Sequence, residues 1–285
     1  MKNKLLSIAF MAIASFSFAQ SGKTPWNATT QKANSVMVAN KQNLINPMLF
    51  ELDVTKLQQE LATAPKRFSA QKSTIVSFPN ADGQMERYSL QESSNMDAEL
   101  AARYPEIKSY VGQGIDNPSA TIYLSLSPLG LQTMVLKADQ SAEFIEPYTT
   151  DKSSYAVYKK SDKIASLNKF ECKVIDEARK DIVSSNAARP NADDGNLRNF
   201  RLAMSVTGEY TAYFGGTKAL ALAAINNTMT RVNGVFEKDF GAHLNLIANT
   251  DLVIYTSAST DPYSPAASLD NWNLELMNTL HSVLG

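Results

Sequence analysis

The most regular hydrophobic pattern of the chain lies within residues 217–238. Its large apolar side chains recur every three or four residues, which places them on one face of an α-helix. Thr217 is a suitable N-cap, and Gly241 allows the chain to reverse after the helix. The apolar stripe consists of Leu222, Ile225, Met229, Val232 and Phe236, and the residues away from it are Asn226, Thr230, Asn233 and Lys238.

Sequences typical of strands stand on both sides of this helix. Residues 200–206 precede it, and residues 243–247 and 252–255 follow it. A strand, a helix and a strand of these lengths favour a right-handed crossover in a parallel sheet. Residues 269–284 begin a second helix, and residues 197–285 are therefore predicted to form an incomplete α/β domain. The expected buried side of the second helix is Leu269, Leu276, Leu280 and Val283.

Residues 45–160 have a different pattern, in which short runs of β-branched and aromatic residues alternate with turn residues. Such repetition predicts an α+β domain that is rich in antiparallel strands. The expected strands are residues 49–53, 74–78, 87–90, 107–111, 121–126, 131–136, 142–148 and 154–158, and the expected helices are residues 56–62, capped by Asp53, and residues 97–102.

The first residues have the pattern of a secretory signal peptide. Lys2 and Lys4 are followed by an apolar run at residues 5–18, which is too short to span a bilayer. Small residues before the end of this segment predict cleavage after Ala19, so that residues 1–19 are removed. The alternative is a retained anchor helix. We expect an exported protein, secreted or held at the cell surface or in the periplasm.

Two further segments carry few large apolar residues. Residues 20–44, which include Trp26, are predicted to be a mobile N-terminal segment of the mature chain. Residues 161–196 are predicted to be an exposed linker. Its basic residues could direct a processing protease, or the linker could remain uncut. These residues are Arg179, Lys180 and Arg189.

Charge and cysteine content exclude several kinds of protein. The net charge is −1, which provides no field to attract nucleic acid or an anionic membrane. Hydrophobic residues make up 44% of the chain, as expected for a globular protein. The single cysteine, Cys172, cannot form an internal disulfide.

Several segments resemble the secreted, reprolysin-like zinc metallopeptidases of bacteria, which belong to the metzincin clan. The segments that resemble the start of the catalytic domain are residues 198–203, 207–210, 228–237 and 251–255, and those that resemble the propeptide are residues 92–96, 104–107, 112–116 and 145–148. The order and spacing of these segments carry the resemblance. It implies a signal peptide, a propeptide at residues 45–160 and the first half of a metzincin domain at residues 197–285.

The resemblance also implies a zinc site that this sequence does not contain. Family members hold Zn²⁺ with the histidines of an HExxHxxGxxH helix, whose glutamate activates the bound water. Here only His243 and His281 are present, and neither begins an HExxH motif. We expect His243 to be structural and His281 to lie on a helix face or to be partly exposed. We therefore interpret the chain as an inactive N-terminal fragment with no catalytic residue, rather than as a degenerate relative.

Two family sites were compared with this sequence residue by residue. Many metzincin zymogens hold a propeptide cysteine against the zinc, which makes Cys172 a candidate latency ligand. The alternative is a half-buried thiol without a role. Some relatives bind calcium through a glutamate in the first strand, but the nearest position here is Arg201, so this site is not carried over; Glu209 follows that strand.

The sequence therefore predicts the N-terminal part of a secreted zinc metalloendopeptidase precursor. In the complete enzyme, zinc would be the cofactor and an edge strand would hold an extended protein or peptide substrate. Signal peptidase and the export machinery would be its other partners. The alternative function is a non-enzymatic, exported binding or surface module that lacks the zinc-binding half.

Overall fold

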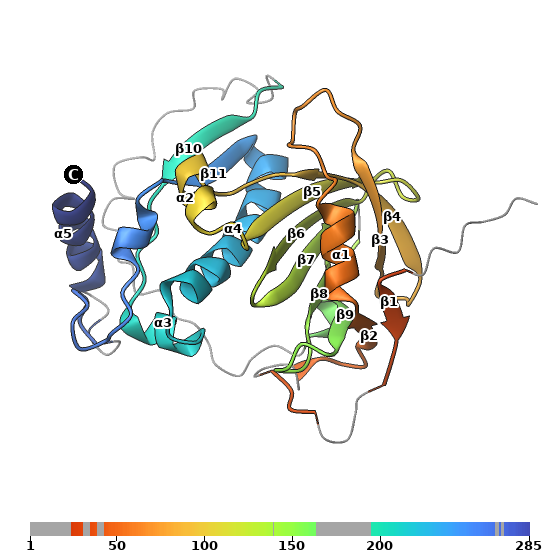
Figure 1. Ribbon diagram of the computed structural model, residues 1–285, viewed down its shortest axis with the longest axis horizontal. Coiled ribbons are helices and arrows are strands. Elements are labelled where there is room, and N and C mark those ends of the chain that lie inside the picture. The colour runs from red at the N-terminus through yellow and green to blue at the C-terminus, as the bar shows by residue number, and fades with distance from the viewer. Residues whose placement is uncertain are drawn as a thin grey trace, which may run out of the picture.

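The computed structural model places two regions against each other (Figure 1). Residues 24–163, here the N-terminal region, form a large sheet, and residues 195–285, the C-terminal region, pack against it. The described residues are 24–30, 35–38, 43–138, 140–163, 195–265, 268 and 271–285.

The N-terminal region is a nine-stranded antiparallel sheet in the order β1-β2-β9-β8-β7-β6-β5-β4-β3. This confirms the prediction of a domain rich in antiparallel strands. Its strands are β1 (Trp26–Ala28), β2 (Met48–Leu52), β3 (Thr74–Pro79), β4 (Met85–Glu92), β5 (Lys108–Gly114), β6 (Thr121–Ser127), β7 (Gly130–Leu136), β8 (Glu143–Pro147) and β9 (Tyr155–Lys159). Its helices are α1 (Val54–Leu61), α2 (Ala98–Arg103) and the short 3-10 helix η2 (Lys160–Asp162).

The sheet curls until its two outer strands, β1 and β3, approach each other. The Trp26 indole nitrogen donates to the Ser77 carbonyl oxygen at 3.1 Å, and its ring meets that of Phe78 at 6.2 Å. Contact between the first and last strands gives the sheet a near-barrel shape, which reduces the unpaired edge that an open sheet exposes.

Trp26 contradicts the prediction that its surroundings are mobile. It lies in β1, is only 4% exposed, and its ring also meets those of Phe50 and Tyr155. The prediction was wrong because a single tryptophan in a polar segment was not expected to fix that segment in place. Burial of one large aromatic side chain, together with three residue pairs between β1 and β2, fixes the strand.

Helix α1 lies beside the curled sheet and buries Leu57 and Leu61 in its core. The predicted cap is confirmed, because the Asp53 carboxylate accepts a hydrogen bond from the Lys56 amide at 2.9 Å. With these residues the sheet encloses a hydrophobic core made only of residues of the N-terminal region.

The C-terminal region confirms the predicted strand–helix–strand unit. Strand β10 (Arg198–Leu202) pairs in parallel with β11 (Ala242–Leu246). Between the two strands the chain forms first the short helix α3 (Gly208–Tyr213) and then the long helix α4 (Lys218–Phe240). Thr217 caps α4, accepting from the Leu220 amide at 3.2 Å, and Gly241 ends it with φ of 60°.

The prediction of a strand at residues 252–255 is wrong. Thr250–Val253 form a 3-10 helix, η4, and only Ile254 pairs with Val206 in a single parallel bridge. The hydroxyl of Thr250 accepts from the Met204 amide at 3.0 Å. This side chain takes the place of a strand beside β10, which itself ends at Leu202 rather than at residue 206.

Helix α5 (Trp272–Leu284) is held at its beginning by Ser264, whose carbonyl accepts from the Trp272 indole at 2.8 Å. Its expected buried side is only partly buried: Leu280 is half-buried, whereas Leu276 is 36% exposed and Val283 40% exposed. Leu269 lies outside the described residues. Within the described part of the chain, no helix is long and apolar enough to cross a membrane.

Candidate functional site

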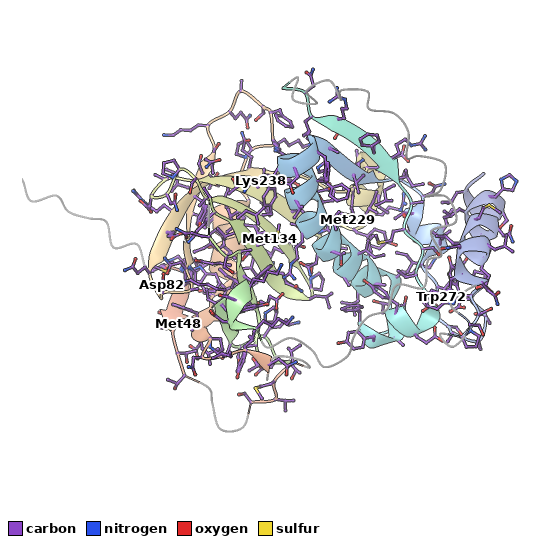
Figure 2. The ribbon with its side chains drawn as sticks, turned by 180° about the vertical axis from the view of Figure 1, so that it is seen from behind. Met48, Asp82, Met134, Met229, Lys238 and Trp272 are labelled. Atoms are coloured by element: carbon purple, nitrogen blue, oxygen red, sulfur yellow. The ribbon has the colours of Figure 1, made fainter. Side chains whose placement is uncertain are left out.

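Helix α4 lies at the boundary of the two regions and contacts both (Figure 1). One side packs on β11 of its own region, and another packs on β5, β6 and β7 of the large sheet. Figure 2 labels Met229 on α4 and Met134 on the facing sheet. A helix covered on two sides makes this boundary the principal candidate for a functional surface.

The apolar side of α4 enters a hydrophobic cluster that both regions build. The predicted stripe is confirmed for Leu222, Ile225 and Met229, each at most 1% exposed. Met96, Leu100 and Ile107 of the N-terminal region complete the same cluster and are themselves buried. The C-terminal region therefore lacks a complete core of its own.

The polar residues beside the stripe are buried, which the sequence pattern did not predict. Asn226 is fully buried, and Thr230 and Asn233 are 4% and 2% exposed. The Asn226 amide nitrogen donates to the hydroxyls of Ser109 at 2.9 Å and Ser125 at 3.0 Å, on β5 and β6. A second face of α4 is thus satisfied by hydrogen bonds from the large sheet.

Asn95, in the connection between β4 and α2, is the centre of this buried network. Its amide nitrogen donates to Thr230 Oγ1 at 2.8 Å and to Asn226 Oδ1 at 3.2 Å. Its oxygen accepts from the Asn233 amide at 2.9 Å. Asn233 in turn accepts from the Leu244 amide at 2.8 Å and donates to the Leu244 carbonyl at 2.9 Å. One asparagine of the N-terminal region therefore links α4 to β11.

The same segment continues along the outer edge of β11. The Leu246 amide donates to the Asn95 carbonyl, and the Asp97 amide donates to the Leu246 carbonyl, both at 2.8 Å. Met96 forms a parallel bridge with Leu246, and its side chain is 5% exposed. At the end of β11, both backbone groups of Leu246 are therefore paired by the N-terminal region.

Gly234 permits the close approach of α4 to the sheet. A Cβ atom at this position would lie 2.7 Å from Met134 Cε and 2.9 Å from Tyr123 Cδ2. These distances are shorter than any ordinary carbon contact. The end of the Met134 side chain can turn away, but the Tyr123 ring or α4 itself would have to shift to admit a larger residue.

An ion-pair network closes one end of the boundary. Arg67 donates to both carboxylate oxygens of Glu237, at 2.8 and 2.9 Å, and the His243 Nδ1 lies 2.7 Å from the same carboxylate. Burial acts to raise the pKa of Glu237, but the hydrogen bonds from His243 and Arg67 outweigh it and hold that pKa below its usual value. Glu237 is therefore an anion at neutral pH.

Two more ion pairs cross the boundary. Arg103 pairs with Asp251 at 3.0 Å, and the Tyr104 hydroxyl donates to the same carboxylate at 3.2 Å. Arg231 of α4 pairs with Glu146 of β8. Each region contributes both positive and negative groups, which fixes the relative position of the two surfaces.

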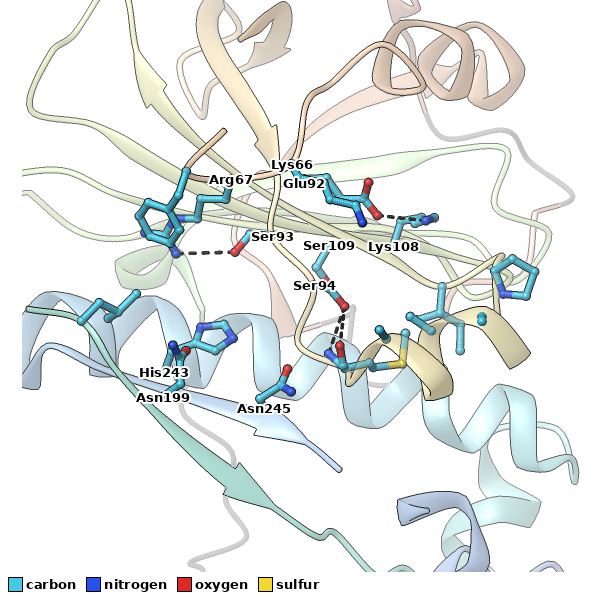
Figure 3. A pocket seen from close by; sticks show the side chains of 18 residues that line it. Lys66, Arg67, Glu92, Ser93, Ser94, Lys108, Ser109, Asn199, His243 and Asn245 are labelled. Atoms are coloured by element: carbon cyan, nitrogen blue, oxygen red, sulfur yellow. Dashed lines mark hydrogen bonds and ion pairs between the residues drawn. The ribbon is translucent and has the colours of Figure 1, made fainter. Parts of the chain in front are cut away.

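A cleft of about 680 Å³ runs beside this boundary (Figure 3). Ser93 and Ser94 lie on one wall, and Asn199, His243 and Asn245 lie on the other. Its volume falls in the range of ligand sites. Two of its basic side chains are already paired within the protein, Arg67 with Glu237 and Lys108 with Glu92, so we assign no ligand to it.

The structure places few of the sequence-predicted site residues at this boundary. His243 is there and is buried, in the structural position that was expected; His281 is exposed on α5. Glu209 and Arg201 are also exposed. Four proposed positions lie outside the described residues, so their roles remain predictions. They are the latency candidate Cys172 and the processing candidates Arg179, Lys180 and Arg189; the signal cleavage position, Ala19, lies outside them as well.

One signal in the sequence could have indicated the buried network. Asn226, Thr230 and Asn233 are spaced by four and three residues, so they form a second helical stripe beside the apolar one. Because polar stripes on helices usually face solvent, this stripe was not interpreted as a buried contact surface. Asn95 carried no local signal at all.

Residues 196–285 match the family model of the reprolysin-like metallopeptidases, family M12B. The match supports a reprolysin-like metallopeptidase domain at the C-terminal end, and this family consists of zinc-dependent peptidases that act on proteins or peptides. A comparison with curated proteins finds no match.

The described residues do not fit the zinc ion that this family uses. The sequence has two histidines, one in β11 hydrogen-bonded to Glu237 and one in α5. No group of three or more histidine, cysteine, aspartate or glutamate side chains able to hold a metal occurs among the described residues. No catalytic step through zinc is therefore derived from this structure.

Proposed function

We propose that the chain is the N-terminal part of an exported zinc metalloendopeptidase precursor, in which the N-terminal region is the propeptide of the reprolysin-like domain. One observation carries the proposal: the domain that matches the peptidase family has a hydrophobic core completed by Met96, Leu100 and Ile107 of the N-terminal region. A segment that supplies core residues to a domain can direct its folding.

The covered surfaces add to this argument. Asn95 binds Asn226, Thr230 and Asn233 on the polar face of α4, and Asn95 and Asp97 pair with the backbone groups of Leu246 in β11. A propeptide that assists folding has to bind surfaces which the domain alone would leave unsatisfied, and these are such surfaces.

Export and processing belong to the same proposal. The pattern of residues 1–19 favours a cleaved signal peptide. In the sequence, Arg179, Lys180 and Arg189 stand between the two regions, where a cut would break the covalent connection. Cys172 stands in the same connection and is proposed to keep the complete enzyme latent. A Cys172→Ser precursor that is active before processing would support that role, and one of unchanged latency would refute it.

The experiment that decides the function is expression of the coding sequence extended beyond Gly285. We expect an HExxHxxGxxH motif in the extension and chelator-sensitive hydrolysis of a protein substrate, which the 285-residue chain alone lacks. An intact gene that stops at this residue, with no such motif, would instead favour the alternative of an exported binding module.

A further inference from the structure

Residues 93–97 connect β4 to α2 and lie between α4 and β11 of the other region. This docking segment makes three kinds of contact at once. Asn95 binds the polar face of α4, Met96 enters the shared hydrophobic cluster, and Asp97 pairs by its amide with β11. The combination of backbone pairing with side-chain recognition is the way in which extended peptides bind to sheet edges.

We propose that this docking segment, rather than the covalent connection, holds the two regions together, so that the N-terminal region stays bound after the chain is cut between residues 163 and 195. The proposal rests on the proposed function, in which the N-terminal region is a propeptide. It identifies the receptor for that propeptide as β11 and the Asn226–Thr230–Asn233 face of α4.

A cut between residues 163 and 195 leaves the contacts between the two regions intact. The hydrogen bonds and ion pairs that cross the boundary each join a residue before 164 to one after 194. Hydrolysis of a peptide bond between these positions removes none of them. Separation would therefore require the buried network, the shared cluster and the ion pairs to open together.

The chemistry of the interface is suited to reversible binding. Its centre contains asparagine, serine and threonine side chains beside the apolar cluster, so the separated surface of α4 would be partly polar. Among the described residues, Asn227 Oδ1 and Arg231 Nε on α4 are buried without a hydrogen-bond partner. Buried unpaired groups weaken an interface, because water satisfies them once the surfaces part.

The experiment uses the full 285-residue chain with a recognition site for a specific protease inserted between residues 164 and 194. After complete cleavage, gel filtration across a dilution series and native mass spectrometry measure whether the two pieces remain together. We expect the wild-type pieces to co-elute at micromolar concentration. Immediate separation would overturn the proposal.

The decisive variant is Asn95→Ala, compared with Asn80→Ala as a matched control. Both residues are buried asparagines of the N-terminal region, but the Asn80 side chain binds within that region, accepting from the Asp82 and Gln84 amides and donating to Glu86 of β4. We expect Asn95→Ala to raise the dissociation constant of the cut pieces about 10-fold to 100-fold, because Thr230 and Asn233 lose a buried partner. Asn80→Ala should leave this constant unchanged.

A second variant keeps the test decisive if Asn95→Ala disturbs folding, as judged by circular dichroism. Gly234→Ala changes only the α4 surface, where the added Cβ would meet Tyr123 and Met134, and it should weaken association at least tenfold. Wild-type association of both variants would overturn the role of this surface. None of these experiments measures hydrolysis. Separation of the cut pieces would therefore not contradict the proposed peptidase function, and an extended chain without activity would not contradict the association.

Discussion

The two largest hydrophobic clusters among the described residues differ in the origin of their residues. The larger cluster lies inside the curled sheet, and each of its members belongs to the N-terminal region. The second cluster surrounds the apolar face of α4 and takes residues from both regions. A self-contained core permits independent folding, whereas a shared core makes one region depend on its neighbour.

Exposure shows the same difference. The N-terminal region joins its outer strands through Trp26, while the C-terminal region has a two-stranded sheet and an α5 helix on which Leu274 and Met277 are 59% and 60% exposed. A sheet of two strands needs further packing to be stable. The N-terminal region supplies part of that packing along β11 and α4.

Separate expression of the two regions should produce the largest effect. We expect residues 24–163 to unfold in one cooperative transition and residues 195–285 to show none. Loss of Met96, Leu100 and Ile107 removes about 1.5–3 kcal/mol for each buried side chain, which is a large part of the roughly 5–15 kcal/mol that stabilises a domain. Thermal unfolding followed by circular dichroism measures this, and a cooperative transition of the isolated C-terminal region would contradict the dependence.

Two leucine substitutions should show, within the intact chain, which elements each hydrophobic cluster stabilises. Leu57 of α1 and Leu100 of α2 are both fully buried, and both belong to the N-terminal region, but they lie in different clusters. Each change to alanine should cost about 2–5 kcal/mol of unfolding free energy. Hydrogen exchange should show that Leu100→Ala reduces protection of α4 and β11, whereas Leu57→Ala reduces it in the large sheet alone. Equal loss of protection in α4 would show one common core.

How far these features follow from the sequence depends on how local they are. The caps at Asp53 and Thr217 and the apolar stripe of α4 were predictable, because each depends on residues within one or two turns. The network at Asn95 was not, since its partners lie 131 to 138 residues away. Helical periodicity places Asn226 on a face of α4 but does not state what covers that face.

The predictions of a mobile segment around Trp26 and of a strand at residues 252–255 were wrong for the same physical reason. Long-range packing gave structure to a segment with weak local signals and removed strand pairing from one with strong signals. The candidate site consists mainly of contacts between distant residues, so the sequence predicted its elements better than its chemistry.

Acid should weaken the boundary through protonation of Glu237. Glu237 has a lowered pKa while it faces Arg67 and His243, so its contribution is complete above its unfolded pKa of about 4.3 and is lost as the pH falls through the lowered value. Glu237→Gln should remove this part of the acid dependence and cost about 1.5–3 kcal/mol at neutral pH. Denaturant unfolding at several pH values measures both quantities.

Glu60 of α1 provides a control of opposite sign. Burial raises its pKa, an effect that Lys56 only partly offsets, so the folded N-terminal region favours the protonated form and loses stability as the pH rises through this pKa. Glu60→Gln should remove that loss and leave the Glu237-dependent slope intact. If Glu60→Gln and Glu237→Gln changed the acid slope in the same direction, the assignment of the slope to the boundary would be wrong.

The smallest expected effect concerns the two helix caps, one in each region. Asp53→Ala and Thr217→Ala each remove one side-chain hydrogen bond to a helix amide, from Lys56 and Leu220 respectively, and each should cost about 1 kcal/mol. The costs are similar because the local chemistry is the same, but the elements that lose stability should differ.

Since α4 is held from both sides, Thr217→Ala should lower the stability of the boundary together with that of the helix, and hydrogen exchange should rise along β11 as well. Asp53→Ala should raise exchange in α1 and in the adjoining sheet while β11 keeps its protection. Protection of β11 that responds equally to both caps would mean that the two regions unfold as one unit, and the difference between the clusters would then be one of composition only.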